Sequence, residues 1–344
     1  MLSNKLKERF CHDMNLSIGI MENPYFIERV ELYDKMKELV EYEHMIEEKF
    51  DNNEERYFEY YNKVKDDAIN YIKSSPAWNA IQADPLRPPM FRYNGTPCPD
   101  IEAIYNRLPK RDAYKDTNIG KYIISIDMCK ANFTALCVYG LQHPESKFVP
   151  DDKVFDYEWF MSQFTDIEHI IKSKYIRQVV FGNCNPSKQT TYEKLLMCYL
   201  LTVLQDGGYI DIEKDVTSLC SDEILIDAND WSIQSFQRLR EATDKFSKEN
   251  FPVRAEFYRL SRVYGSDAYV KEFLDCDKTY EIKCATPEEM PFLQRMMRSE
   301  PFNKTDLVFR FKNKLAQFME YPNLIKTYLP MSKWFPQPNN NESK

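Results

Sequence analysis

The chain has 344 residues, of which 43% are hydrophobic and 29% are charged, and this composition is typical of a globular protein. Its formal net charge of −8 gives no support to a dedicated nucleic-acid binder, and it does not exclude a local basic groove. No window approaches the roughly 20 uncharged apolar residues of a membrane helix, and the N-terminus lacks the apolar core of a secretory signal. We therefore expect an intracellular protein, in the cytoplasm or at a site of replication, that is not secreted and has no membrane partner.

Neither the cysteines nor the histidines predict a metal centre. The nine cysteines include no C-x-x-C pair and do not make a disulfide framework in so long a chain. The four histidines lack metal-ligand spacing, so no structural zinc is expected.

Residues 1–74 are predicted to form an N-terminal helical region. Apolar side chains recur at helical spacing through residues 23–50 and again through 52–75, with many acids between them. This pattern predicts a helical hairpin that packs on the rest of the chain. As an alternative, the acidic helices are a surface for a protein partner.

Residues 75–119 are predicted to form a proline-rich linker of extended and turn structure. Five prolines lie between Pro85 and Pro99, and Asn94-Gly95 marks a turn. At the other end of the chain, the polar tail 336–344 is predicted to be disordered.

Residues 120–335 are predicted to form an α+β domain. An isoleucine-rich strand covers 121–127, helices cover 156–181 and 186–205, and two short apolar runs on either side of Ser221-Asp222 predict a hairpin. The remaining elements are a helix over 229–250, strands over 251–265, 268–275 and 279–285, and a helix over 287–300.

The order strand, helices, hairpin, helix, strand is that of a split βαβ unit, in which an antiparallel sheet carries helices on one face. The end of the first strand then lies beside the turn of the hairpin, so Asp127 and Asp222 are predicted to meet. Two facing carboxylates suit a two-metal Mg²⁺ site, and without a cation such acids raise each other's pKa. The structural alternatives are a helix cap at Asp127 and turn chemistry at Asp222.

Three segments resemble motifs A, B and C of nucleic-acid polymerase palms, most closely those of family A DNA polymerases: SIDMCKANFTAL, RQVVFG and SLCSDEILID. Asp127 matches the metal-binding Asp of motif A. Asn132 stands five residues on, where the family has the Glu that discriminates against the ribose 2′-hydroxyl. Asp222 and Glu223 match motif C, with Ser221 in place of its usual His. The resemblance covers about residues 120–265.

Motif B is matched by Arg177, Phe181 and Gly182, with Arg in place of the usual Lys. The resemblance implies that Arg177 holds the nucleotide triphosphate and that Phe181 stacks near its base. Independently of the resemblance, Lys188 lies at the predicted start of a helix, where a phosphate can bind. The alternative there is a simple helix start with Ser187 as its cap.

The resemblance therefore implies a divergent polymerase-like protein, with a palm-like split βαβ sheet, that acts on nucleic acid or nucleotides. If it is active, it is a nucleotidyltransferase of the DNA polymerase type, with Mg²⁺ or Mn²⁺ on Asp127 and Asp222 and with Glu223 as an auxiliary catalytic acid. Two alternatives stay open. One is a catalytically inactive scaffold or interaction protein on a palm-derived or unrelated α+β core, and the other is a non-catalytic module that binds single-stranded nucleic acid.

Overall fold

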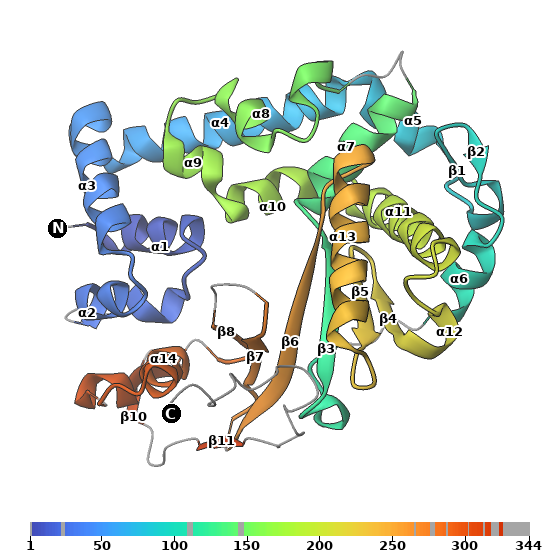
Figure 1. The fold of residues 1–344 in the computed structure, drawn as a ribbon. Coiled ribbons are helices and arrows are strands. Elements are labelled where there is room, and N and C mark those ends of the chain that lie inside the picture. Colours follow the sequence, from blue (N-terminus) through green and yellow to red (C-terminus); the bar gives the residue numbers. More distant parts are fainter. Residues whose placement is uncertain are drawn as a thin grey trace, which may run out of the picture.

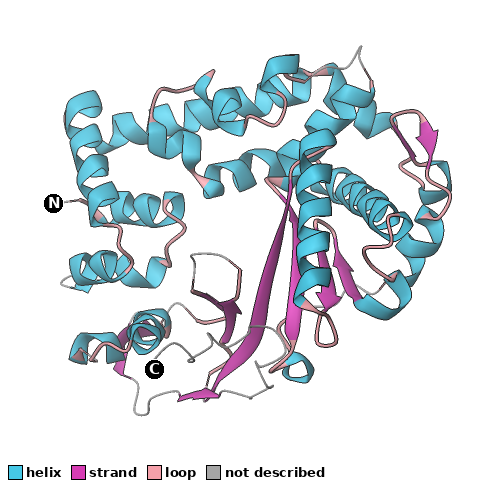
Figure 2. Ribbon diagram, viewed as in Figure 1, coloured by secondary structure: helices cyan, strands magenta, loops and turns pink. Residues whose placement is uncertain are grey.

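The computed structural model describes residues 2–21, 25–108, 113–143, 148–264, 266–275, 279–286, 288–301, 303–311, 314–317 and 323–325. The predicted α+β class is confirmed: an antiparallel sheet is combined with helices that precede its strand β3 and helices that lie between its strands (Figure 1, Figure 2). The tail 336–344 lies outside the described residues. In the part of the chain that is described, none of the helices is both long and apolar enough to cross a membrane.

The N-terminal region is helical, as predicted, with a break that the periodicity did not reveal. Asp34 has a left-handed φ of 55° and separates the predicted helix over 23–50 into α2 and α3. The side chain of Asn53 caps α4, which completes the predicted hairpin with α3. The elements are α1 (Asn4–Asp13), η1 (Ile18–Met21), α2 (Tyr25–Leu32), α3 (Met36–Phe50) and α4 (Glu54–Ser74).

The proline-rich segment is folded and packed, so the predicted linker is wrong as a description of it. Asn94 and Gly95 have φ values of 48° and 76° and form the turn of a small two-stranded sheet. Phe91 and Tyr93 are buried in the main hydrophobic core, because the aromatic side chains between the prolines find apolar partners. The elements are α5 (Pro76–Ala83), η2 (Pro88–Met90), β1 (Arg92–Tyr93), β2 (Thr96–Pro97), α6 (Ile101–Arg107) and η3 (Asp116–Asn118).

The main sheet has the strand order β4-β5-β3-β6-β7-β8, and β11 also pairs with β6. Every neighbouring pair is antiparallel. The predicted first strand and hairpin are confirmed, and the first strand lies directly beside the second strand of the hairpin. The strands are β3 (Tyr122–Met128), β4 (Val216–Cys220), β5 (Glu223–Asp227), β6 (Val253–Tyr264), β7 (Tyr269–Phe273), β8 (Tyr280–Lys283) and β11 (Asn323–Ile325).

The two faces of this sheet differ in character. Ile124 and Ile126 of β3 lie in the main hydrophobic cluster, on the face where α11 and α13 contact β4 and β6. Ser125 and Asp127 alternate with them and therefore lie on the opposite face. That opposite face is polar at the end of β3 where Asp127 stands.

The helices that follow β3 are shorter and more numerous than predicted. The predicted helix over 156–181 is three helices, because Ser173 caps a new helix with its hydroxyl and because residues 163–167 are not helical. The long α11 matches its prediction. The helices are α7 (Ala131–Gln142), α8 (Tyr157–Ser162), α9 (Glu168–Lys172), α10 (Lys174–Gly182), α11 (Pro186–Asp206), α12 (Ile212–Asp215) and α13 (Ile233–Glu249), with η5 (Asp151–Lys153) before α8.

One cluster of buried hydrophobic residues runs from Leu6 to Phe257, so the regions 1–74 and 75–119 share a core with the sheet. A separate cluster joins α14 to the β7–β8 edge of the sheet through Val270, Phe292 and Leu293. The C-terminal elements are α14 (Met290–Arg298), η6 (Lys304–Leu307), β9 (Val308–Phe311) and β10 (Lys314–Gln317).

Candidate active site

The end of β3 and the turn of the β4–β5 hairpin meet, as the order of the elements predicts. Asp127 is paired in register with Glu223, and the backbone N–H of Met128 donates to the carbonyl oxygen of Asp222 at 2.8 Å. Ser221 lies in the hairpin turn with a left-handed φ of 47°. Strained backbone of this kind is common at functional sites, and here it presents Asp222 beside the strand end.

Burial has the largest effect on the pKa values of the acids at this end of the sheet. Burial raises the pKa of Asp127 to about 7, and the negative charges of Asp222, Glu223 and Glu256 contribute in the same direction, while Arg254 opposes them. Burial also raises the pKa of Asp222 above its ordinary value. A bound cation would therefore stabilise the ionised form of this pair.

Glu223 is held in the polar face of the sheet. Its carboxylate accepts a hydrogen bond from the Ser125 hydroxyl at 2.5 Å, and the ammonium group of Lys271 lies 3.9 Å from it. Lys271 is itself buried, 3.6 Å from the carboxylate of Glu256 and 4.5 Å from the centre of the Tyr258 ring. These contacts fix the orientation of Glu223 next to Asp127.

A further acid, Glu193 of α11, was missed by the sequence analysis. Its side chain belongs to a residue that is 4% exposed, and its Oε1 atom has no hydrogen-bond partner among the described residues. Burial raises the pKa of Glu193 to about 8, and the charge of Asp222 contributes. The sequence feature that could have revealed Glu193 is the charged pair Glu193-Lys194 inside the otherwise apolar face of a long helix. Charged side chains are rarely buried in such a place unless they are paired or functional.

Basic side chains lie beside the acids, around the ring of Tyr157. Lys130 forms an ion pair with Glu158 at 2.5 Å, and its ammonium group is 5.5 Å from the Tyr157 ring centre. The guanidinium group of Arg177 is 5.6 Å from the same ring centre. Lys130 has a left-handed φ of 51°, the second strained residue of the site.

Electrostatic interactions tie this basic group to the acid pair. Burial raises the pKa of the Cys129 thiol, and the charge of Asp127 raises it further. Lys130 and Arg177 lower the same pKa. The thiol therefore lies within electrostatic range of Asp127 and of these two basic side chains. Lys174, one turn before Arg177 in α10, lowers the pKa of Asp222. Lys130 and Arg177 therefore act on Cys129, two residues after Asp127, and Lys174 of α10 acts on Asp222.

The remaining predicted site residues lie in positions that are less favourable for binding a nucleotide. Asn132 lies in the first turn of α7, two residues beyond Lys130, and is partly exposed. Phe181 is 0% exposed and packs edge-on against Phe133 at 6.2 Å between ring centres. Its predicted stacking on a base is therefore wrong, because no face of the ring is open to a ligand. Lys188 donates to the backbone carbonyl of Asp84 and thereby ties α11 to the end of α5; phosphate binding there stays a prediction.

The donor set fits a hard divalent cation, although it is small. Among the described residues, no three or more His, Cys, Asp or Glu side chains are grouped as a metal site. Mg²⁺ does not require such a group, because it commonly keeps several waters and binds one or two carboxylates together with substrate phosphates. The carboxylates of Asp127 and Asp222 would be the ligands of such an ion, and metal binding there stays a prediction.

Comparison with family models, with curated proteins and with solved structures finds no match for this chain. The assignment of a function therefore depends on the chemistry of the site.

Proposed function

We propose that this chain is a divergent polymerase-like protein that transfers nucleotidyl groups at the end of β3, with Mg²⁺ or Mn²⁺ held by Asp127 and Asp222. The observation that carries the proposal is the meeting of a strand-end acid with a hairpin-turn acid, next to the basic side chains of α10. The predicted resemblance to a polymerase palm requires this juxtaposition.

Each residue has a distinct role in this proposal. The cation, when bound, supplies activation of the attacking hydroxyl and stabilisation of the leaving oxygen. Asp127 and Asp222 hold that cation, and Glu223, fixed by Ser125, keeps the surrounding potential negative. Arg177 and Lys130 bind the phosphates of the incoming nucleotide, since both are cations grouped around the ring of Tyr157. Asn132, partly exposed in the first turn of α7, is the residue assigned to the sugar.

Nucleotide incorporation on a primed template tests the proposal. Wild-type protein, Asp127→Asn and Asp222→Asn are compared with either Mg²⁺ or Mn²⁺, using deoxynucleotides and ribonucleotides in separate reactions. We expect the wild type to extend the primer and each variant to lose about 10²-fold or more in rate, which is the usual effect of removing one electrostatic group. Asp67→Asn, on the exposed surface of α4, is the matched control and should retain full activity.

A second substitution separates nucleotide binding from chemistry. Arg177→Ala removes a charge-assisted contact to phosphate and should raise the KM for nucleotide by about 10–100-fold. Arg56→Ala, an exposed arginine of α4, should leave KM unchanged. Absence of incorporation by a folded wild-type protein would overturn the enzymatic proposal and leave the inactive scaffold. Binding of single strands that survives Asp127→Asn, without incorporation, would favour the non-catalytic binding module.

A further inference from the structure

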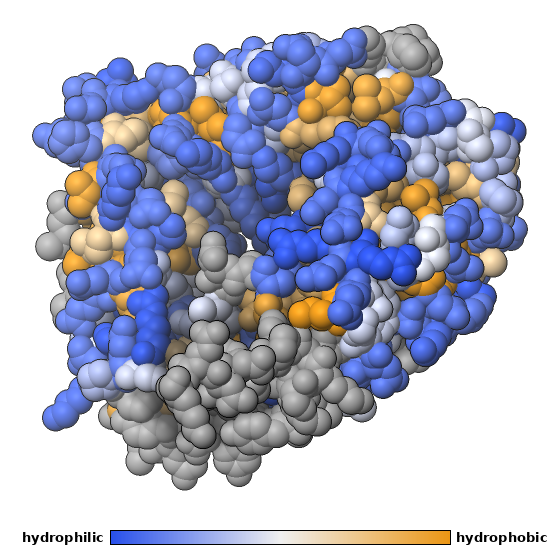
Figure 3. All heavy atoms as spheres, viewed as in Figure 1, coloured by the Kyte–Doolittle hydropathy of each residue, from blue (hydrophilic) through white to orange (hydrophobic). Residues whose placement is uncertain are grey.

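A cavity of about 670 Å³ lies between α5, the β1–β2 turn, the end of α7 and α11. Its size is that of an ordinary small-molecule site, and its lining is mostly apolar, as such sites usually are. The face of the molecule drawn in Figure 3 is largely hydrophilic, but hydrophobic residues gather at its upper right, where Figure 1 places α5. Met90, which lines the cavity, is 67% exposed.

The cavity is distinct from the candidate active site. Helix α7 begins directly after Lys130 and ends at Gln142, which lines the cavity. Its 12 residues make a helix of roughly 18 Å, so the two places lie at opposite ends of α7. Neither Asp127 nor Asp222 is among the described residues that line the cavity.

Aromatic rings form much of the cavity wall. The ring of Tyr192 in α11 packs edge-on against Phe91 at 6.0 Å and against Tyr139 of α7 at 5.3 Å, measured between ring centres. All three residues line the cavity. Because aromatic rings pack well against one another, this wall favours a ligand with a flat ring.

The loop between α5 and η2 is fixed by hydrogen bonds of Asp84. Its carboxylate accepts from the backbone N–H of Leu86 at 2.8 Å and from the hydroxyl of Tyr139 at 3.0 Å, and its carbonyl oxygen accepts from Lys188. Leu86 has a left-handed φ of 46°, which a bulky residue rarely adopts. The cavity is therefore formed before a ligand arrives.

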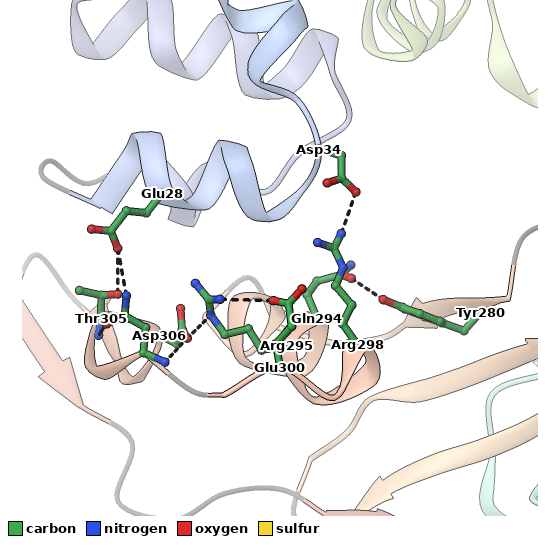
Figure 4. Close-up of polar contacts among 10 residues, drawn as sticks. Glu28, Asp34, Tyr280, Gln294, Arg295, Arg298, Glu300, Thr305 and Asp306 are labelled. Carbon is green, nitrogen blue, oxygen red and sulfur yellow. Dashed lines mark hydrogen bonds and ion pairs between the residues drawn. The ribbon is translucent and has the colours of Figure 1, made fainter.

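Two buried polar atoms of the lining lack a partner. Among the described residues, nothing forms a hydrogen bond with the hydroxyl of Tyr192 or with Nε2 of Gln142. Polar groups elsewhere in the molecule satisfy one another; between α2 and α14, for example, the guanidinium of Arg298 donates to Asp34 at 3.0 Å (Figure 4). Buried polar atoms usually have partners, so a ligand with acceptors on its ring edge would supply those that are missing here.

The charge of the lining favours an anion, although the whole chain carries a net charge of −8. Arg87 and Arg92 are exposed and line the cavity, and Arg92 also donates to the carbonyl oxygen of Gly95 at 3.3 Å. Asp84 is the one acid among the described lining residues, and both of its carboxylate oxygens already accept hydrogen bonds. A guanidinium group matches the geometry of a phosphate.

We propose that this cavity binds a nucleotide, with the base against the rings of Phe91, Tyr139 and Tyr192 and the phosphate at Arg87 and Arg92. One molecule then meets every requirement of the lining, because it joins a flat ring, acceptors on the ring edge and a negative charge. The proposal goes beyond nucleotidyl transfer at the end of β3 and does not depend on it. A nucleotide bound here is a second ligand, separate from the substrate.

Calorimetric titration with the adenine, guanine, cytosine and uracil nucleoside monophosphates tests the proposal. EDTA is present, so that no cation holds a nucleotide at Asp127. We expect at least one of the four to bind, and the matching nucleoside to bind about tenfold more weakly or worse because it lacks the phosphate. Arg87→Ala and Arg92→Ala should each weaken binding about tenfold, whereas Arg56→Ala, at an exposed position of α4, should have no effect.

The substitution Tyr192→Phe separates binding from folding. It removes only a hydroxyl that has no partner among the described residues, so the ligand-free protein should not lose stability. Nucleotide binding should weaken by about 3–10-fold, because the bond to the ligand is lost. Tyr42→Phe, at a buried tyrosine of α3 that does not line the cavity, should leave binding unchanged.

Failure of a folded wild type to bind any of the nucleotides would overturn the proposal. Binding that is lost in Arg177→Ala but kept in Arg87→Ala and Arg92→Ala would also overturn it, because the nucleotide would then lie at the candidate active site. Equally strong binding of indole-3-acetate would show that the cavity takes aromatic anions in general, which contradicts a nucleotide site. Nucleotide binding that persists in Asp127→Asn, and in a wild type that extends no primer, supports the cavity and contradicts only the enzyme.

Discussion

At the scale of single residues, the proposed site depends most on Asp127. Its carboxyl is buried against Asp222 and Glu223, and its pKa is raised from 3.8 to about 7. Between those values the folded protein binds a proton that the unfolded chain has released. The stability contributed by this group therefore falls as pH rises through that window.

The substitution Asp127→Asn should stabilise the metal-free protein, and more so at pH 8 than at pH 5. After a discount for partial exposure, we expect a gain on the order of 1–2 kcal/mol at pH 8 in the free energy of unfolding. Urea unfolding at both pH values measures it, with Asp67→Asn as the control. Saturating Mg²⁺ should reverse the order of the two proteins, because only the wild type retains the full ligand pair. A variant that is less stable than the wild type at pH 8 without metal would contradict the assigned environment.

Some residues of the site could be predicted from the sequence and others could not. The meeting of Asp127 with Asp222 follows from strand order, because neighbouring antiparallel strands bring their ends together. The burial of Phe181 could not be predicted, since helical periodicity does not say which neighbour covers a given face. Glu193 was not predicted as a site residue because it lies within a helix whose sequence is mostly apolar. Lys130 was not predicted because it is a single basic residue after a strand.

At the scale of elements, the position of α10 decides whether the basic residues reach the acids. Ser173 caps this helix, and its hydroxyl also donates to the buried carboxylate of Asp13 at 2.8 Å. Asp13 lies at the end of α1 and also accepts from the hydroxyl of Tyr61 in α4. The N-terminal helices therefore hold the first turn of α10, which contains Lys174 and Arg177.

The substitution Ser173→Ala should cost about 1–2 kcal/mol of stability, because it removes both a helix cap and a buried hydrogen bond. Thermal or urea unfolding measures this loss. Ser187→Ala, at an exposed position in the first turn of α11, should change stability by no more than about 0.5 kcal/mol. Equal effects of the two substitutions would show that the contact between Ser173 and Asp13 does not hold α10.

The strands were easier to predict than the helix boundaries. Isoleucine-rich runs on either side of a two-residue turn leave few alternatives to β3 and the hairpin. The helix predicted over 156–181 is divided because the hydroxyl of Ser173 caps a new helix. The apolar periodicity continues across this position, so it did not reveal the cap. The proline-rich segment folds because its aromatic residues, such as Phe91, are buried in the common core.

At the scale of the whole molecule, a shared core makes the N-terminal helices and the sheet one cooperative unit. The cluster that contains Phe10 and Tyr57 also contains Ile124 and Phe257. We therefore expect the intrinsic fluorescence of the tryptophans and the far-ultraviolet circular dichroism to change together in urea, in a single transition. Two separate transitions would show instead that residues 1–74 unfold independently of the rest, in agreement with the domain division that the sequence predicts.

The measurement that tests the central claim most directly is Mn²⁺ binding by the metal-free protein at pH 7.5, followed by electron paramagnetic resonance. Wild-type protein should bind the ion, Asp127→Asn and Asp222→Asn should each weaken binding by about tenfold or more, and Asp67→Asn should match the wild type. Binding that is equally strong in all four proteins, or absent from a folded wild type, would contradict a cation site at the meeting of β3 with the hairpin.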